Sequence, residues 1–279
     1  MMPELPENSG EGGSGRPGSG QAVGCEQPCG TLVIGGGPAG LFAAVRLARL
    51  LRKAGGGREN NPSLPVRVLE RMPRPGRKLL VSGSGRCNIA HDAPVDELLG
   101  RYGGGGKPGS AARFLRRALS ALDSPTLLAW FADRGLTFTT EANGKVFPSS
   151  GRASDVLAAL LREAETLAVE IVTGRRALAV TALPGGGFRV EVEPSAAGAA
   201  GAAGAAGAAG AAGAAVAAGV AGEVLRPASR NDSDMMTINT IILATGGITW
   251  PVTGSSGDGY ALAAALGHPL VRPKPALAA

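Results

Sequence analysis

Residues 31–41 read Thr-Leu-Val-Ile-Gly-Gly-Gly-Pro-Ala-Gly-Leu. The apolar run at 32–34 is typical of a strand buried on both faces of a parallel sheet. A Gly-x-Gly-x-x-Gly turn follows at once, and residues 41–51 then place apolar side chains at helical spacing. This order of strand, glycine-rich turn and helix predicts the phosphate-binding turn of a Rossmann βαβ unit.

The three glycines of the motif have separate predicted tasks. Gly35 makes the tight turn, Gly37 lets the backbone approach a pyrophosphate, and Gly40 lets the helix pack closely on the strand. The helix N-terminus adds N–H donors and positive partial charge. In a chain with 45 glycines, the alternative is a glycine-rich turn of an ordinary α/β protein.

An acidic residue ends the next predicted strand, Val66-Arg-Val-Leu-Glu70. A carboxylate at this position is placed to bond an adenosine ribose 2′-OH. The spacing from the motif exceeds the usual ~20 residues, and we expect a surface insertion over residues 55–65 to account for it. The two features together predict a dinucleotide site.

A rarer segment follows at residues 76–88, Gly-Arg-Lys-Leu-Leu-Val-Ser-Gly-Ser-Gly-Arg-Cys-Asn. Further on, the chain reads Lys-Val-Phe-Pro-Ser-Ser at 145–150, Ile-Leu-Ala-Thr-Gly-Gly at 242–247 and Thr-Gly-Ser-Ser-Gly-Asp-Gly-Tyr at 253–260. This combination resembles the YhiN/BaiN-like (HI0933-type) family of NAD(P)/FAD-dependent oxidoreductases, over residues 31–277 outside two low-complexity stretches.

The resemblance implies an α/β fold, a Rossmann-like FAD-binding domain of the glutathione-reductase kind with an inserted, partly β second region. It implies an FAD-binding region with its helical and β insertion at 31–192, and at 237–279 a return to the FAD-binding domain and the start of a further domain. Composition predicts a disordered tail at 1–30 and a low-complexity Gly/Ala loop at 193–236. Because related proteins continue beyond this point into a further domain, we expect a C-terminally truncated member.

The resemblance also implies a set of cofactor contacts. The FAD diphosphate would meet Gly35, Gly37, Pro38, Ala39 and Gly40. Glu70, followed by Arg71, would hold the adenosine ribose. The ribityl chain and flavin ring would lie along Lys78 and the loop that contains Ser82, Gly85, Arg86, Cys87 and Asn88. Further contacts would come from Val180, Ala244, Thr245, Gly246, Gly247 and Asp258.

Several of these side chains have alternative roles. Lys78 either neutralises negative charge on the cofactor or is a surface lysine, and Arg86 has the same options or an internal ion pair. Cys87 is a single cysteine, so a small buried residue is favoured over electron exchange with a flavin. His91 is more consistent with a loop role than with proton donation. Asp258 is either a helix cap or a ligand contact.

Composition limits the binding partners, metal sites and cellular compartment that we expect for this protein. The net charge of +6 comes from basic residues spread along the chain, which favours a solvated mixed surface without specific nucleic-acid binding. Three cysteines argue against a disulfide framework, and Cys25 and Cys29 lack the second pair that a metal site needs. No signal pattern or membrane-length apolar run is present in the sequence, so we expect a cytoplasmic protein.

The remaining sequence predicts alternating helices and strands. We expect helices over 111–134 and from Ser154, with Ser154 or Asp155 as its cap, and a hairpin turn at Asn143-Gly144. Predicted strands cover 136–140, 169–173, 177–181, 188–192 and 238–244, and a last helix covers 261–266. A glycine break at 102–109 and a Gly-Ala-Ala tract at 195–222 are read as loops.

The function expected from these features is hydride transfer from NAD(P)H through FAD to an unidentified organic acceptor. One alternative is a flavoenzyme like fumarate reductase or ketosteroid dehydrogenase, which the Ala-Thr-Gly-Gly and Gly-Asp-Gly segments also suit. Another is a truncated, non-catalytic nucleotide-binding fragment. An RNA-associated flavoprotein is supported only by the positive charge.

Overall fold

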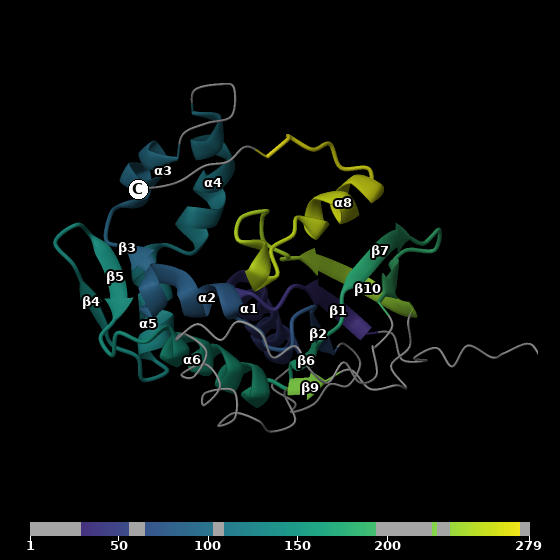
Figure 1. The fold of residues 1–279 in the computed structure, drawn as a ribbon, viewed down its shortest axis with the longest axis horizontal. Coiled ribbons are helices and arrows are strands. Elements are labelled where there is room, and N and C mark those ends of the chain that lie inside the picture. The colour runs from purple at the N-terminus through teal and green to yellow at the C-terminus, as the bar shows by residue number, and fades with distance from the viewer. Residues whose placement is uncertain (1–28, 56–64, 103–108, 194–224, 228–234, 274–279) are drawn as a thin grey trace, which may run out of the picture.

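The computed structural model describes residues 29–55, 65–102, 109–193, 225–227 and 235–273 (Figure 1). Four predicted segments lie largely or wholly outside these ranges: the N-terminal tail, the insertion at 55–65, the glycine break at 102–109 and the Gly-Ala-Ala tract.

A seven-stranded sheet forms the centre of the fold, in the order β7-β8-β10-β1-β2-β6-β9. Its strands are β1 (Cys29–Ile34), β2 (Val66–Glu70), β6 (Glu170–Thr173), β7 (Ala177–Ala182), β8 (Phe188–Val192), β9 (Leu225–Pro227) and β10 (Met235–Leu243). The strands from β10 to β9 run parallel, whereas β8 pairs antiparallel with both β7 and β10. The sheet is therefore a mixed Rossmann-type sheet with a parallel centre.

The central strands bury both faces, as the apolar run at 32–34 predicted. Val33 contributes to one hydrophobic cluster, with Val68 and Ile171, while Leu32 and Ile34 contribute to a second cluster. The first cluster lies beneath α1 (Pro38–Ala54) and α6 (Ala153–Thr166), and the second includes Leu262 of α8 (Asp258–Ala265). Helices therefore cover the two faces of the sheet, as an α/β fold requires.

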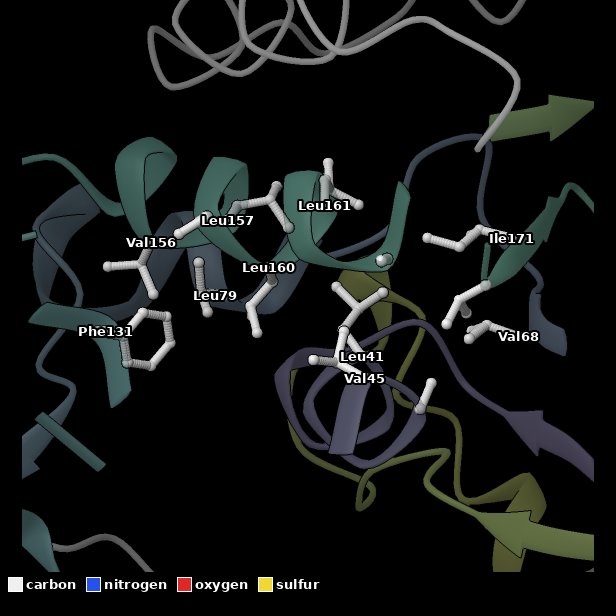
Figure 2. Packing of buried hydrophobic residues seen from close by; sticks show 14 of the residues in the cluster. Leu41, Val45, Val68, Leu79, Phe131, Val156, Leu157, Leu160, Leu161 and Ile171 are labelled. Atoms are coloured by element: carbon white, nitrogen blue, oxygen red, sulfur yellow. The ribbon is translucent and has the colours of Figure 1, made fainter. Parts of the chain in front are cut away.

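Figure 2 shows how the first cluster is assembled. Apolar side chains of three helices meet in this cluster. They are Leu79 of α2 (Arg77–Val81), Leu41 and Val45 of α1, and Val156, Leu157, Leu160 and Leu161 of α6. The packing fixes the segment at 76–88 beside the first βα unit.

An inserted region lies between β2 and α6. It holds a three-stranded antiparallel sheet in the order β3-β5-β4, made of β3 (Ala90–His91), β4 (Phe138–Thr140) and β5 (Lys145–Pro148). It also holds α3 (Val95–Arg101), α4 (Ser110–Ala121) and α5 (Ser124–Ala132), as Figure 1 shows. The Asn143-Gly144 hairpin turn is confirmed, because the Gly144 N–H donates to the Glu141 carbonyl at 2.8 Å.

Two helix starts differ from the sequence prediction. The helix α6 begins at Ala153 after an Arg152 cap that makes no side-chain hydrogen bond, so neither Ser154 nor Asp155 is its cap. Asp155 instead pairs with Arg152 at 3.1 Å. The helix α8 begins at Asp258, three residues earlier than predicted, because Gly257 adopts a left-handed conformation and starts the turn.

Within the described ranges, no helix combines the length and apolar character that crossing a bilayer requires.

Candidate dinucleotide-binding cleft

The glycine-rich turn has the geometry that its sequence predicted. Gly35 has φ +114°, and a Cβ there would lie 2.4 Å from the Ala244 carbonyl oxygen. A Cβ on Gly40 would lie 1.9 Å from the Gly35 carbonyl oxygen. Both positions therefore require glycine, the first for the turn and its close approach to β10, the second for the contact between α1 and β1.

Gly37 differs from its two neighbours in the motif. It precedes α1 in extended conformation, with φ −75° and ψ 178°, and a Cβ there would meet nothing within 4 Å. Pro38 follows at the first helical position, and the first turn of α1 has no acidic residue. The positive end of α1 therefore faces open space, which fits a bound diphosphate.

Glu70 lies directly beside this turn. Its Oε2 accepts from the Gly36 N–H at 2.7 Å and its Oε1 from the Met72 N–H at 2.8 Å. The side chain is only 8 % exposed. Burial raises the pKa of the Glu70 carboxyl above its ordinary value, while these two N–H donors oppose the rise. Each carboxylate oxygen keeps a second acceptor site, so the group remains able to bond ribose hydroxyls.

A cleft of about 250 Å³ opens at the carboxyl ends of β1, β2, β6 and β10. This is the edge at which open α/β sheets bind ligands. Of the predicted contacts, the cleft is lined by Gly35, Gly37, Pro38, Ala39, Glu70, Arg71, Lys78, Ala244, Thr245, Gly246 and Asp258. Residues more than 200 positions apart in sequence thus line one cleft.

The cleft is strongly cationic. Six cationic side chains and two carboxylates, Glu70 and Asp258, line it. The cations are Arg71, Arg74, Arg77, Lys78, Arg175 and Arg176. Arg175 is only 1 % exposed, and its backbone N–H donates to the Glu70 carbonyl at 3.0 Å. This lining matches a ligand that carries two phosphates.

An ion-pair network joins three chain segments at the cleft. Asp258 accepts from Arg176 at 2.8 and 2.9 Å and is 3.4 Å from Arg71 Nη1. Ser256 donates to the same carboxylate at 2.7 Å. The hydrogen bond from Arg176, together with the charges of Arg176 and Arg71, holds the pKa of Asp258 below its ordinary value. Of the two roles considered for Asp258, the helix cap is wrong, because Gly257 is the cap of α8. The Asp258 carboxylate instead joins α8 to the end of β2 and the start of β7 by ion pairs.

Asp258→Asn is therefore expected to lower the free energy of unfolding by about 1 kcal/mol at pH 7. A lowered folded-state pKa gives stability that is present above the ordinary value of 3.8 and is lost as the pH falls below it. The difference between wild type and variant should therefore shrink at about pH 3, which urea unfolding at both pH values measures. Exposed Asp133→Asn is the control, and an equal effect there would contradict the ion-pair assignment.

The loop from Ser82 to Asn88 lies outside this cleft. It rests on the small sheet, where Arg86 pairs with Glu141 at 2.8 Å and lies 4.0 Å from the centre of the Phe147 ring. Ser84 and Cys87 have φ +57° and +64°, which is rare for residues other than glycine. Such strain is concentrated at functional sites. Lys78 lines the cleft and donates to the Thr249 carbonyl at 2.7 Å, which links α2 to the segment that follows β10.

Other predicted positions are also outside the cleft lining. Gly40 lies beneath the turn, Gly247 follows the lining residues, and Val180 is buried in the second hydrophobic cluster. Cys87 is a free thiol that is 4 % exposed, and burial raises its pKa. His91 lies in β3, where Nε2 is 2.7 Å from Arg101.

Sequence reasoning missed twelve residues that line the cleft: Ile34, Leu69, Arg74, Gly76, Arg77, Arg175, Arg176, Ala177, Thr253, Gly254, Ser255 and Leu262. The pair Arg175 and Arg176 was detectable in principle. They follow a predicted strand that is parallel to its neighbours, and the carboxyl ends of parallel strands meet at one edge.

The mixed sheet with its parallel centre, the glycine-rich turn and the cationic cleft define a Rossmann-type FAD-binding fold. The HI0933-like protein Rossmann domain matches residues 29–215, and the chain belongs to this family. The chain is 29% identical over 245 residues to the 3-dehydro-bile acid delta(4,6)-reductase of Clostridium scindens, covering 88% of this chain and 46% of that protein. It is 23% identical over 248 residues to the ribosomal RNA dihydrouridine synthase of Haemophilus influenzae, covering 88% and 47%.

The chain thus spans about half the length of the curated relatives it matches. Among solved structures, L-proline dehydrogenase from P. horikoshii matches with TM-score 0.40 and 9% identity, over 86% of this chain and 56% of that one. Thermovibrio ammonificans THI4 matches with TM-score 0.38 and 13% identity, over 79% and 58%. The family assignment rests on the match over residues 29–215.

Proposed function

We propose that the protein is an FAD-dependent oxidoreductase that takes hydride from NAD(P)H and passes it to an organic acceptor. The observation that carries this proposal is the open position above Gly37, at the positive end of α1, in a cleft lined by six cationic side chains. Family membership and the names of the relatives support it. A reducing, cytoplasmic setting belongs to the same proposal and suits the free Cys87 thiol.

Bound FAD would supply the hydride and electron transfer. The chain's own residues would bind and orient it: the Ala39 and Gly40 N–H groups at the start of α1 would face the diphosphate, and Glu70 would accept from the ribose. Arg71 and Arg176, held by Asp258, would add positive charge beside the cleft. The Ser82–Asn88 loop is proposed for the flavin side, because of the family resemblance and the strained backbone at Ser84 and Cys87.

A carbon–carbon double bond next to a carbonyl group is the acceptor chemistry that we favour. The bile-acid relative is named as a delta(4,6)-reductase, which describes reduction of such a bond in a steroid. The reaction would consume the hydride of NAD(P)H and one proton from solvent, so that electrons and atoms balance. A fumarate-reductase-like or ketosteroid-dehydrogenase-like reaction is the alternative within this class.

A second candidate is the reduction of uridine in RNA, which the rRNA dihydrouridine synthase relative favours. This also saturates a carbon–carbon double bond conjugated to a carbonyl. The two candidates therefore differ in how the acceptor is recognised and share the same redox chemistry.

Anaerobic mixing of the FAD-loaded chain with NADH or NADPH tests the proposed function. We expect the oxidised-flavin absorption band to bleach with one or both nucleotides. An enone steroid, an unsaturated dicarboxylic acid and a uridine-containing RNA are then added separately, and the productive acceptor is the one that restores the band. A loaded protein that neither nucleotide reduces would contradict the proposal, and a chain that never retains FAD would favour a non-catalytic fragment.

A further inference from the structure

The helix α4 is the most cationic exposed element of the inserted region. Its sequence, Ser-Ala-Ala-Arg-Phe-Leu-Arg-Arg-Ala-Leu-Ser-Ala, contains three arginines and no acidic residue. No residue of α4 is fully buried. Figure 1 shows it beside α3, away from the seven-stranded sheet. The positive charge of α4 is therefore accessible to molecules in solution.

The arginines of α4 share one exposed face. Arg113, Arg116 and Arg117 are spaced at i, i+3 and i+4, so their side chains are neighbours on the helix surface. Arg116 pairs with Asp96 of α3 at 2.7 Å, and both side chains are more than half exposed. An exposed pair of this kind is weak and leaves Arg116 able to contact another anion. Within the described part of the chain, Arg113 and Arg117 form no ion pair.

An aromatic side chain stands among these arginines. Phe114 is 84 % exposed, far more than an aromatic residue on a monomer surface normally is. The leucines of α4, Leu115 and Leu119, are half-buried instead. Because both leucines are partly covered, less of the apolar face of α4 is free for insertion into a lipid surface, which needs that face exposed.

We propose that the exposed face of α4, formed by Arg113, Phe114, Arg116 and Arg117, is a docking surface for RNA. The guanidinium groups match backbone phosphates in charge and geometry. Phe114 matches an unpaired base, because exposed aromatic rings stack on bases in single-stranded regions. This inference deepens the second candidate function and rests on it for its biological meaning. The three arginines of α4 are thus clustered in space, although basic residues are spread along the sequence as a whole.

The test is fluorescence anisotropy with a labelled single-stranded RNA about 12 nucleotides long, a length within the usual site size. We expect the double variant R113Q/R117Q to bind at least about tenfold more weakly than wild type. The slope of log K against log salt concentration should fall by about 1.4, at about 0.7 for each cation removed. Phe114→Ala should weaken RNA binding about fivefold or more, whereas Phe114→Tyr, which keeps an aromatic ring, should bind RNA like wild type.

The matched control is R46Q/K53Q, which removes two exposed cations from α1. It should bind RNA like wild type. Equal binding by R113Q/R117Q and wild type, or an equal loss in the control, would overturn the docking surface. Co-sedimentation with phosphatidylserine vesicles, lost in R113Q/R117Q and without RNA binding, would also overturn it and assign α4 to a membrane surface. Since RNA binding is measured without turnover, its failure is distinct from a failure to bind or reduce flavin.

Discussion

Gly37→Asp is expected to abolish FAD binding while the protein stays folded. The backbone at Gly37 is in an extended conformation that any residue adopts, and a Cβ there would meet nothing within 4 Å. Aspartate at this position would also accept from the free N–H groups at the start of α1, which caps the helix and stabilises it by about 1 kcal/mol. The same carboxylate would occupy the position proposed for the diphosphate and repel it.

The expected loss of affinity is at least about a hundredfold, because placing like charges side by side in a binding site costs several kcal/mol. Isothermal titration with FAD measures the affinity, and urea unfolding measures the stability of the same preparations. Gly37→Ala is the control, since it adds a Cβ without charge. If Gly37→Asp bound FAD as tightly as Gly37→Ala, the diphosphate would not lie at this turn.

Gly40→Ala is expected to destabilise the fold strongly, whereas Gly37→Asp is expected to leave the protein folded. The added Cβ would lie 1.9 Å from the Gly35 carbonyl oxygen. Because this oxygen belongs to the backbone, it cannot move aside by a change of side-chain rotamer. Either α1 moves away from β1 or the turn opens, and both disrupt the first hydrophobic cluster. We expect a loss of about 3 kcal/mol or more, a large part of the 5–15 kcal/mol that a typical domain has.

A second helical glycine provides a matched control for this substitution. Gly100 lies in α3, and a Cβ there would meet nothing within 4 Å. Gly100→Ala should therefore raise stability by roughly 0.5–1 kcal/mol through helix propensity. Thermal unfolding of the two variants beside wild type measures both effects. A Gly40→Ala protein as stable as wild type would show that α1 does not contact β1 in this way.

The first βαβ unit was predictable because its constraints are local. An apolar run, three spaced glycines and a terminal Glu70 each reflect one backbone requirement, so the pattern gives the turn, the close packing and the strand end. The strand β8 was likewise predicted from its alternation, with the bounds that the structure has.

The cationic lining of the cleft was less predictable, because it depends on tertiary contacts between segments that are far apart in the sequence. Arg71, Arg176 and Asp258 come from three distant segments, and only the strand order brings them together. The start of α6 was predicted wrongly for a related reason. Tertiary packing of Ala153 and Val156 into the first cluster sets where the helix begins, and it overrides the capping preference of Ser154.

The placement of the Ser82–Asn88 loop remains the part of the proposed site that the cleft itself does not include. Its position beside the small sheet, with Arg86 on Phe147, depends on packing between elements far apart in sequence. Its flavin contact is therefore proposed from the family resemblance and from the strained Ser84 and Cys87.

The central claim is that this cleft holds FAD, and the most direct measurement is the visible absorption spectrum of the purified chain after incubation with excess FAD and removal of free flavin by desalting. We predict a protein-bound oxidised-flavin band near one FAD per chain for wild type, and none for Gly37→Asp. A wild-type chain that elutes folded but colourless, as Gly37→Asp is expected to do, would contradict the claim.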